Sequence, residues 1–402
     1  MSIQQRLYPT PIQARVFSSH VRDARYVWNL ALEQANLYRK SLGPTPNLME
    51  RFRQLTEARK DTWLDDGSVM IQQQALRDLD QAFQNWWKNP QYFNRPTWRK
   101  VGINEGFRIV SLKTRQINKN WGEVLIPKCG WVKFRLTREF NGIKATKSAR
   151  ITIDKSQRWH INFVALQPEF IREQTKSVVG IDLGITNSVT LSDNRHINMP
   201  ILLSPGEYQR KKRLQRKMVK QQKGSNRRLK TKHSLAKIFA KEVDRRKDWI
   251  EKTTTKLVKD FDIIVIEDLK VKNMSKSAKG TKESPGTNVK AKSSLNREIN
   301  SQAWGTFRKR LNDKASTATS PVEIIAINPA FTSQCCSKCG HTTIKNRKNQ
   351  AIFICQSCAY TDNADINASK NILAAGLAVT GRGGTPEFIG PMNRQPSIEM
   401  SI

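Results

Sequence analysis

Acidic residues are scarce in this sequence of 402 residues, which has 34 Asp and Glu against 70 Lys and Arg and a formal net charge of +36 at pH 7. Such an excess of positive charge destabilises a compact chain unless a polyanion neutralises it. Long apolar runs are also lacking, so no segment approaches the roughly 18 residues of a membrane-spanning helix. The N-terminus has no apolar stretch typical of a secretory signal. We therefore expect nucleic acid as the partner and no association with a membrane.

Cysteines are few as well, and the six present do not suit the disulfide framework of a secreted protein. Four of them form two C-x-x-C pairs separated by fifteen residues: Cys336, Cys339, Cys355 and Cys358. This spacing is typical of a four-thiolate zinc site, in which each pair directs two thiolates at one tetrahedral ion. We predict one structural Zn²⁺. Cys335 offers an alternative register and two disulfides an alternative chemistry, whereas His341 and Cys129 are expected not to bind the ion.

The spacing of apolar residues changes along the chain and predicts separate domains. Around residues 16–32 and 71–86 apolar residues recur at helical intervals, and a turn is expected at 43–46 between them. From about residue 96 to 173 the period becomes two, which predicts a small antiparallel barrel. Its expected strands are 124–127, 132–136, 150–153 and 159–164.

Carboxylates stand at the ends of two apolar segments that read as buried strands. Asp182 lies in the first segment, and Glu267 follows the second directly, which makes it a better candidate than Asp268. An ionised carboxylate in a buried strand is costly unless it is paired or binds a metal, and ligands of α/β sheets gather at strand ends. Further along, Asp365 opens an apolar helix for which Asp362 is the expected N-cap.

Three carboxylates from two strands and a helix can converge on a pair of Mg²⁺ ions. Such ions activate the attacking water and stabilise the leaving oxygen of a phosphodiester. On a chain of charge +36, this order of residues predicts a nuclease. Its expected catalytic residues and magnesium ligands are Asp182, Glu267 and Asp365.

At these residues the sequence resembles the TnpB family of transposon-encoded RNA-guided nucleases, which are relatives of the type V CRISPR effectors. Residues 180–184 are similar to the first RuvC motif of that family, residues 266–269 to the second, and residues 364–368 with 371–372 to the third. The cysteine segment from residue 332 matches the zinc insert between the last two motifs, and residues 6–13 and 25–29 look like the family's opening. The resemblance covers most of the chain.

The resemblance implies a multidomain α+β fold. It comprises an RNase H-like (RuvC) α/β nuclease domain with a zinc-ribbon insert, an N-terminal helical recognition domain and a β-barrel wedge domain. The expected boundaries are 1–10 and 96–173 for the wedge barrel, 11–95 for the helical domain, 176–331 and 359–380 for the RuvC domain, and 332–358 for the zinc insert. A disordered tail is expected over residues 381–402, where no apolar period remains.

The same resemblance implies an RNA-guided endonuclease, encoded by an insertion sequence, that cleaves double-stranded DNA next to a short adjacent motif. A guide RNA would read the target by base pairing, while the protein reads the short motif and the shape of the heteroduplex. The alternatives are a compact type V CRISPR effector with the same chemistry, a non-cleaving RNA-guided DNA binder, and a guide-free resolvase. A cytoplasmic, nucleoid-associated protein of a bacterium or archaeon is expected, as a monomer or a dimer.

Between the first two motifs, residues 210–249 hold seventeen Lys or Arg and three acidic residues, a local net charge of +14. A thin apolar stripe predicts two helices joined near residues 224–226, and their cations are expected to hold phosphates without reading sequence. The candidate nucleic-acid-binding residues are Arg210, Lys211, Lys212, Arg213, Arg216, Lys217, Arg227 and Arg228. The lysine-rich loop at 270–292 is expected to be either a lid over the site or a plain surface loop.

Overall fold

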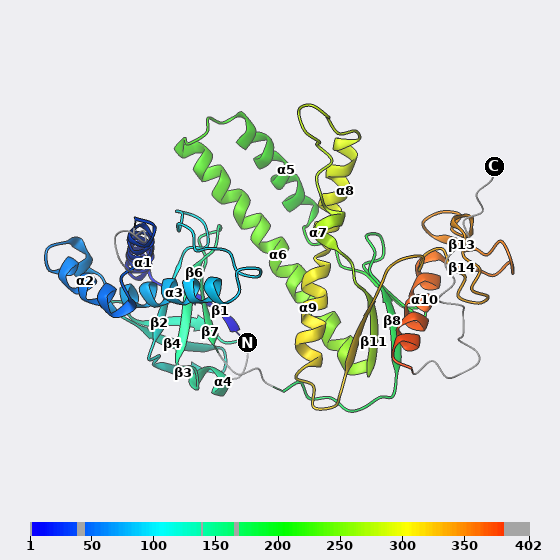
Figure 1. Cartoon of the computed structure of the whole chain (residues 1–402), viewed down its shortest axis with the longest axis horizontal. Coiled ribbons are helices and arrows are strands. Elements are labelled where there is room, and N and C mark those ends of the chain that lie inside the picture. Colours follow the sequence, from blue (N-terminus) through cyan, green and yellow to red (C-terminus); the bar gives the residue numbers. More distant parts are fainter. Residues whose placement is uncertain (1, 38–44, 138–139, 165–168, 382–402) are drawn as a thin grey trace. The chain divides into compact units, whose positions relative to one another are not determined.

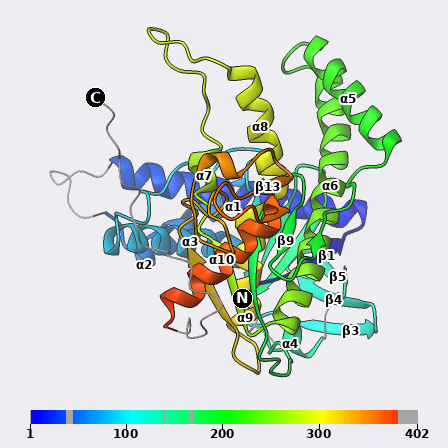
Figure 2. The ribbon, with the colours of Figure 1, turned by 90° about the vertical axis from the view of Figure 1, so that its right-hand side faces the viewer.

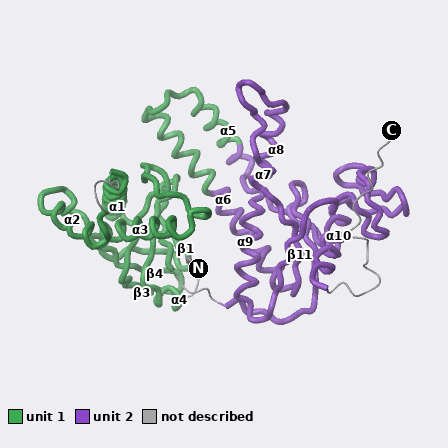
Figure 3. Tube along the Cα trace, in the orientation of Figure 1, with its two compact units in different colours: residues 1–168, 209–240 green, residues 169–208, 241–402 purple. Residues whose placement is uncertain are grey.

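The computed structural model describes residues 2–37, 45–137, 140–164 and 169–381, shown in Figure 1 and, turned by 90°, in Figure 2. The chain divides into two compact units, which Figure 3 distinguishes by colour. Unit 1 comprises residues 1–168 and 209–240, and unit 2 comprises residues 169–208 and 241–402. Part of the turn expected at 43–46 and all but the first residue of the tail expected over 381–402 lie outside the described residues.

Unit 1 contains a seven-stranded antiparallel sheet in the order β2-β6-β7-β1-β5-β4-β3. The strands are β1 (Ser2–Tyr8), β2 (Gly106–Val110), β3 (Thr114–Asn118), β4 (Trp121–Ile126), β5 (Gly130–Arg135), β6 (Ser148–Ile153) and β7 (Trp159–Val164). They confirm the four strands expected from the period of two. The N-terminal strand β1 completes this sheet, because Ile3 pairs with Phe163 on one side and Leu7 pairs with Phe134 on the other.

Helices pack against the sheet of unit 1 and share its core. They are α1 (Pro11–Leu37), α2 (Leu48–Lys60), the 3₁₀ helix η2 (Trp63–Asp66), α3 (Val69–Lys88) and the short α4 (Asn141–Lys144). Phe17 of α1 contacts Phe107 of β2 and Trp159 of β7 edge-on, with ring centroids 5.8 and 5.0 Å apart. One hydrophobic core therefore joins segments that we expected in two domains, a helical one ending at residue 95 and a barrel.

Unit 2 is built on a five-stranded sheet in the order β10-β9-β8-β11-β12. Its strands are β8 (Val178–Asp182), β9 (Val189–Leu191), β10 (His196–Ile197), β11 (Ile263–Glu267) and β12 (Glu323–Ile327). The strands β8, β11 and β12 run parallel, whereas β9 and β10 form antiparallel hairpins at one edge. The near-continuous apolar sequence of β8 and β11 fits strands covered on both faces.

Helix α10 (Ala364–Val379) lies directly over β8 and β11, as Figure 1 shows. Two glycines permit this close approach. A Cβ added at Gly180 would lie 2.2 Å from the carbonyl oxygen of Ser369, and one at Gly376 would lie 2.5 Å from the side chain of Val265. The glycine in the first acidic motif thus allows the helix that carries Asp365 to reach the strand that carries Asp182.

The remaining elements connect or extend these sheets. They are α5 (Pro205–Lys220), α6 (Asn226–Asp260), α7 (Val271–Met274), α8 (Val289–Gln302), α9 (Trp304–Ala315), the 3₁₀ helix η3 (Ile344–Asn346), β13 (Ile352–Ile354) and β14 (Thr361–Asn363). The basic segment forms two helices, α5 and α6, that are separated at residues 221–225 as predicted. Among the described residues, no helix combines the length and apolar character needed to cross a bilayer.

Candidate catalytic centre and cysteine site

Asp182 and Glu267 end two neighbouring parallel strands. Strand β8 pairs with β11 in a register that sets Ile181 opposite Ile266, so the next residue on each strand carries one of the carboxylates. Both carboxylates therefore emerge at the same edge of the sheet, where ligands of parallel sheets are held. Asp365 lies in the first turn of α10, which packs on these strands. The order strand, strand, helix expected from the sequence is observed.

We expected Asp362 to be the N-cap of α10. The N-cap is instead Asn363. The Asn363 side-chain oxygen accepts hydrogen bonds from the backbone N–H groups of Asp365, at 2.9 Å, and Ile366, at 3.2 Å. Asp362 instead accepts hydrogen bonds from Lys370 Nζ at 2.8 Å and from the Tyr360 hydroxyl at 2.6 Å. The acidic residue in the first turn of α10 is Asp365, and negative charge at the N-terminus of a helix is favourable.

The electrostatic environment ties the three carboxylates together. Burial and the nearby carboxylates of Glu267 and Asp365 raise the pKa of Asp182 to about 7, against the Arg347 guanidinium and a hydrogen bond from the backbone N–H of Leu183. Burial also raises the pKa of Glu267, against a hydrogen bond from Thr332. A bound cation would relieve this repulsion, because an opposite charge favours the ionised form of a carboxyl group.

Three residues that sequence reasoning missed contact these carboxylates. The Asn187 side chain donates to Asp365 Oδ2 at 3.0 Å, and the Thr332 hydroxyl donates to Glu267 Oε1 at 2.7 Å. Arg347 Nη2 lies 3.3 Å from Asp365 Oδ1. Asn187 stands in the turn after β8, which was a usable signal. Thr332 and Arg347 come from the segment around the cysteines, and no local pattern links them to the carboxylates.

Asp268 occupies a different environment from Glu267. It forms ion pairs with Lys270 and Arg308, and hydrogen bonds from these two cations lower the pKa of its carboxyl group. Its neighbour Glu267 has a neutral hydroxyl partner in Thr332 and a raised pKa. The choice of Glu267 over Asp268 as a metal ligand stays a prediction, and these two environments favour it.

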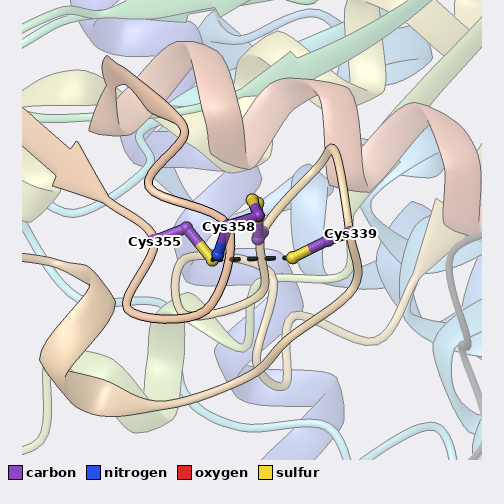
Figure 4. A group of neighbouring side chains, drawn as sticks. Cys339, Cys355 and Cys358 are labelled. Atoms are coloured by element: carbon purple, nitrogen blue, oxygen red, sulfur yellow. Dashed lines mark hydrogen bonds between the residues drawn. The ribbon is translucent and has the colours of Figure 1, made fainter.

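The sulfur atoms of Cys336, Cys339, Cys355 and Cys358 lie together, and Figure 4 shows three of these side chains around one point. All four lie within 4.8 Å of one another; Cys336 Sγ is 3.7 Å from Cys358 Sγ, and Cys339 Sγ is 3.5 Å from Cys355 Sγ. Among the described residues, this is the one group of three or more His, Cys, Asp or Glu whose ligand atoms lie so close together. The group can hold a zinc ion.

Local hydrogen bonds favour a thiolate at Cys355, whereas burial raises the pKa of Cys336 and of Cys339. Burial alone would raise the pKa of Cys355, but hydrogen bonds from the backbone N–H groups of Cys358 and Ser357 lower it to about 7. Both N–H groups lie 3.4 Å from its sulfur. Cys335 is excluded from the group, and its sulfur contacts the Gly340 carbonyl at 3.5 Å. The His341 side chain is exposed and does not belong to the group either.

The candidate phosphate-binding cations lie on α5 and at the start of α6. Six of them are exposed. Five lie on α5, namely Arg210, Lys212, Arg213, Arg216 and Lys217, and the sixth is Arg227 of α6. Lys211 stands over the Phe239 ring, 4.6 Å from its centroid. Arg228 donates to the carbonyl groups of Met218, in the last turn of α5, and of Gln221, which follows that helix. Arg228 thus links the start of α6 to the end of α5, and its expected role in binding phosphate stays a prediction.

The loop at 270–292 contains α7 and is attached to the start of α8. Lys292 Nζ donates to the Met274 carbonyl at 2.7 Å, and the Asn296 side chain donates to the carbonyl groups of Ser275 and Lys276, both at 3.0 Å. Its role as a lid stays a prediction.

Comparison with known proteins gives matches along most of the chain. The family model of OrfB_IS605, described as "Probable transposase", matches residues 163–278. A "Cas12f1-like, TNB domain" model matches residues 304–372, and a "Helix-turn-helix domain" model of the OrfB_IS605 type matches residues 1–43. Within that last range, residues 2–37 form strand β1 and the single helix α1.

Individual relatives extend this picture. The chain is 35% identical to "Putative RNA-guided DNA endonuclease InsQ" of Escherichia coli K12 over 383 residues. This match covers 93% of this chain and 91% of that protein. It is 29% identical over 396 residues to "Putative RNA-guided DNA endonuclease" of Streptomyces pristinaespiralis, covering 95% and 90% of the two chains. A "CRISPR-associated endodeoxyribonuclease Cas12f1" of Sulfoacidibacillus thermotolerans is 51% identical over 51 residues, or 13% of this chain and 12% of that protein.

Proposed function

This chain belongs to the TnpB family, and on that premise we propose that it is an RNA-guided DNA endonuclease that cleaves double-stranded DNA by Mg²⁺-dependent hydrolysis. The observation that carries this proposal is the convergence of Asp182, Glu267 and Asp365 at one edge of a parallel sheet. The raised pKa of Asp182 indicates that this site favours a bound cation.

The roles of the residues follow from their positions. Asp182 and Glu267, held by strands, and Asp365, held by a helix, provide hard oxygen ligands of the kind that Mg²⁺ prefers. When bound, a pair of such ions supplies an activated water and stabilises the leaving oxygen. Asn187 and Thr332 orient two of the ligands through the hydrogen bonds described above.

The domain assignment follows the same proposal. The sheet of unit 2 with α10 is the RuvC-type nuclease domain, over residues 176–331 and 359–380. Residues 332–358 are its zinc insert, with one structural Zn²⁺. The sheet of unit 1 corresponds to the wedge barrel and its helices to the recognition domain. Guide RNA and target DNA bind basic surfaces that include α5, in the cytoplasm of a bacterium or archaeon.

An insertion-sequence nuclease is favoured over a compact CRISPR effector. The similarity to the Escherichia coli protein spans 91% of that relative, whereas the similarity to Cas12f1 spans 12% of that effector. A non-cleaving binder is disfavoured because three acidic residues occupy the candidate site. A guide-free resolvase remains a distinct outcome of the experiment below.

The test is purification of the chain with its bound RNA, sequencing of that RNA, and cleavage of a plasmid that carries the matching target. We expect cleavage with Mg²⁺, and we expect Asp182→Ala and Glu267→Gln each to slow it more than about 100-fold, since even outer partners of metal ligands contribute 10–100-fold. Asp268→Asn is the matched control and should cleave like the wild type. Cleavage without RNA would indicate the resolvase, and no cleavage with any divalent ion would refute the enzyme.

A further inference from the structure

Two asparagines of α10 hold the segment that leads into the cysteine site. Asn367 and Asn371 are four residues apart and therefore lie on one face of the helix, one turn after the other. Both side-chain amides donate to the carbonyl oxygen of Cys335, at 2.8 and 2.7 Å. Asn367 is fully buried, and its side-chain oxygen also accepts from the backbone N–H of Ser337 at 2.9 Å.

These bonds surround the first cysteine of the metal site. Cys336 lies between Cys335 and Ser337, the two residues that Asn367 contacts, and its side chain is 1% exposed. The position of this cysteine is thus fixed on one side by α10 and on the other side by its three sulfur neighbours. Binding of an ion by the four cysteines and the docking of this loop on α10 therefore depend on the same few backbone atoms.

The same segment reaches Glu267. Asn371 donates to the Thr332 carbonyl at 2.9 Å, and the Thr332 hydroxyl donates to Glu267 Oε1 at 2.7 Å. The hydroxyl also lies 3.1 Å from the Pro329 carbonyl, and of these two acceptors an ionised Glu267 carboxylate is the stronger. A continuous path therefore joins Glu267 to Asp365 through Thr332, Asn371 and the body of α10.

We propose that the cysteine ribbon (residues 332–358) is a positioning element for the acidic cluster (Asp182, Glu267 and Asp365). In this role Thr332, Asn367 and Asn371 are positioning residues, which transmit the folding of the ribbon to the geometry of the divalent-ion ligands. This inference rests on the proposed function only in taking the acidic cluster as a divalent-ion site.

A purely structural role and a positioning role predict different results. If the bonds only attach the ribbon, removing the Thr332 hydroxyl lowers stability or zinc content and leaves divalent binding at the acidic cluster unchanged. If they position Glu267, the same change weakens divalent binding while the ribbon keeps its zinc. Outer partners of metal ligands typically contribute 10–100-fold to metal affinity.

The experiment compares Thr332→Val, Thr332→Ser and the matched control Thr342→Val in the full-length chain. Thr342 is an exposed ribbon residue whose hydroxyl donates to the Gly340 carbonyl. Mn²⁺ binding is measured by calorimetry, with Asp182→Ala as background, and zinc content and the unfolding temperature are measured alongside. We expect Thr332→Val to weaken Mn²⁺ binding about 10-fold or more, while Thr332→Ser and Thr342→Val bind like the wild type and all keep about one zinc.

Asn371→Leu provides a second, independent variant of similar size and should weaken Mn²⁺ binding in the same direction. Unchanged Mn²⁺ affinity in Thr332→Val would overturn the proposal. Loss of zinc together with Mn²⁺ binding in this variant would also overturn it, because that result indicates a purely structural role. Wild-type Mn²⁺ binding no stronger than that of Asp182→Ala would overturn it together with the proposed nuclease. If Mn²⁺ binds and Thr332→Val weakens it, but no DNA is cleaved, the positioning role stands and the proposed activity falls.

Discussion

Arg347 of the cysteine ribbon forms an ion pair with Asp365 at the start of α10, with 3.3 Å between Nη2 and Oδ1. Its charge also lowers the pKa of Asp182. The guanidinium of this ribbon residue thus partly neutralises the negative charge of the acidic cluster. Because a divalent ion bound to Asp365 would compete with this guanidinium, we expect Arg347 to oppose metal binding at low Mg²⁺.

We expect Arg347→Gln to lower the Mg²⁺ concentration that gives half-maximal cleavage. An ion pair that is partly exposed contributes up to about 1 kcal/mol, so the shift should be up to about fivefold. A titration of the single-turnover cleavage rate with Mg²⁺ measures it. Lys345→Gln, an exposed cation of the same ribbon, is the matched control. A higher Mg²⁺ requirement in Arg347→Gln would contradict this account of the ion pair.

The zinc prediction separates two adjacent cysteines. Metal analysis of the purified chain should find about one zinc. Cys335→Ser should keep that zinc, because the Cys335 sulfur lies outside the group of four. Cys336→Ser should lose most of it, since a four-thiolate site needs every ligand. Zinc loss in Cys335→Ser with retention in Cys336→Ser would show that the ligand register is shifted.

The cations of α5 are expected to act through phosphates. Changing Arg213 and Arg216 to Gln together should reduce the slope of log affinity for RNA against log salt by up to about 1.4–1.8, at about 0.7–0.9 for each phosphate that an arginine no longer neutralises. Filter binding at several salt concentrations measures the slope. Arg228→Gln should instead increase hydrogen exchange at the end of α5, whose carbonyl groups its guanidinium contacts. An unchanged slope in the double variant would exclude phosphate binding by these two arginines.

An ion pair in unit 2 should make stability depend on pH. The Arg172 side chain is 1% exposed and pairs with Asp262. Burial alone would raise the pKa of Asp262, but hydrogen bonds from Arg172, Thr175 and Lys176 outweigh it and lower the pKa to about 2. Because the pKa in the folded chain is below the unfolded value of about 3.9, the stabilisation is present above pH 4 and is lost as the pH falls toward 2.

Asp262→Asn should therefore lower the free energy of unfolding at pH 7, by about 3 kcal/mol if the buried guanidinium loses its charged partner. The difference between wild type and variant should shrink as the pH falls from about 4 to 2. Denaturant unfolding followed by tryptophan fluorescence measures both. A difference that stays constant over this range would show that the ion pair is not its source.

Much of the local structure could be predicted because it depends on neighbouring residues. The apolar spacing in residues 16–32 and 71–86 predicted α1 and α3, and the period of two predicted β4 to β7. The expected helical and barrel domains, by contrast, share one core. Periodicity marks the buried face of an element but does not identify the element against which that face packs.

The candidate site divides in the same way. By itself the sequence determined the cysteine pairs, the carboxylates at the ends of apolar segments and the excess of positive charge, because residue type and short spacing are enough to recognise each. Only the tertiary structure decided that Thr332 contacts Glu267 and Arg347 contacts Asp365. It also decided that Arg228 of α6 contacts the carbonyl group of Met218 at the end of α5. These roles arise because folding sets the donors and acceptors of different segments within about 3 Å of each other, and many polar residues could have occupied those positions.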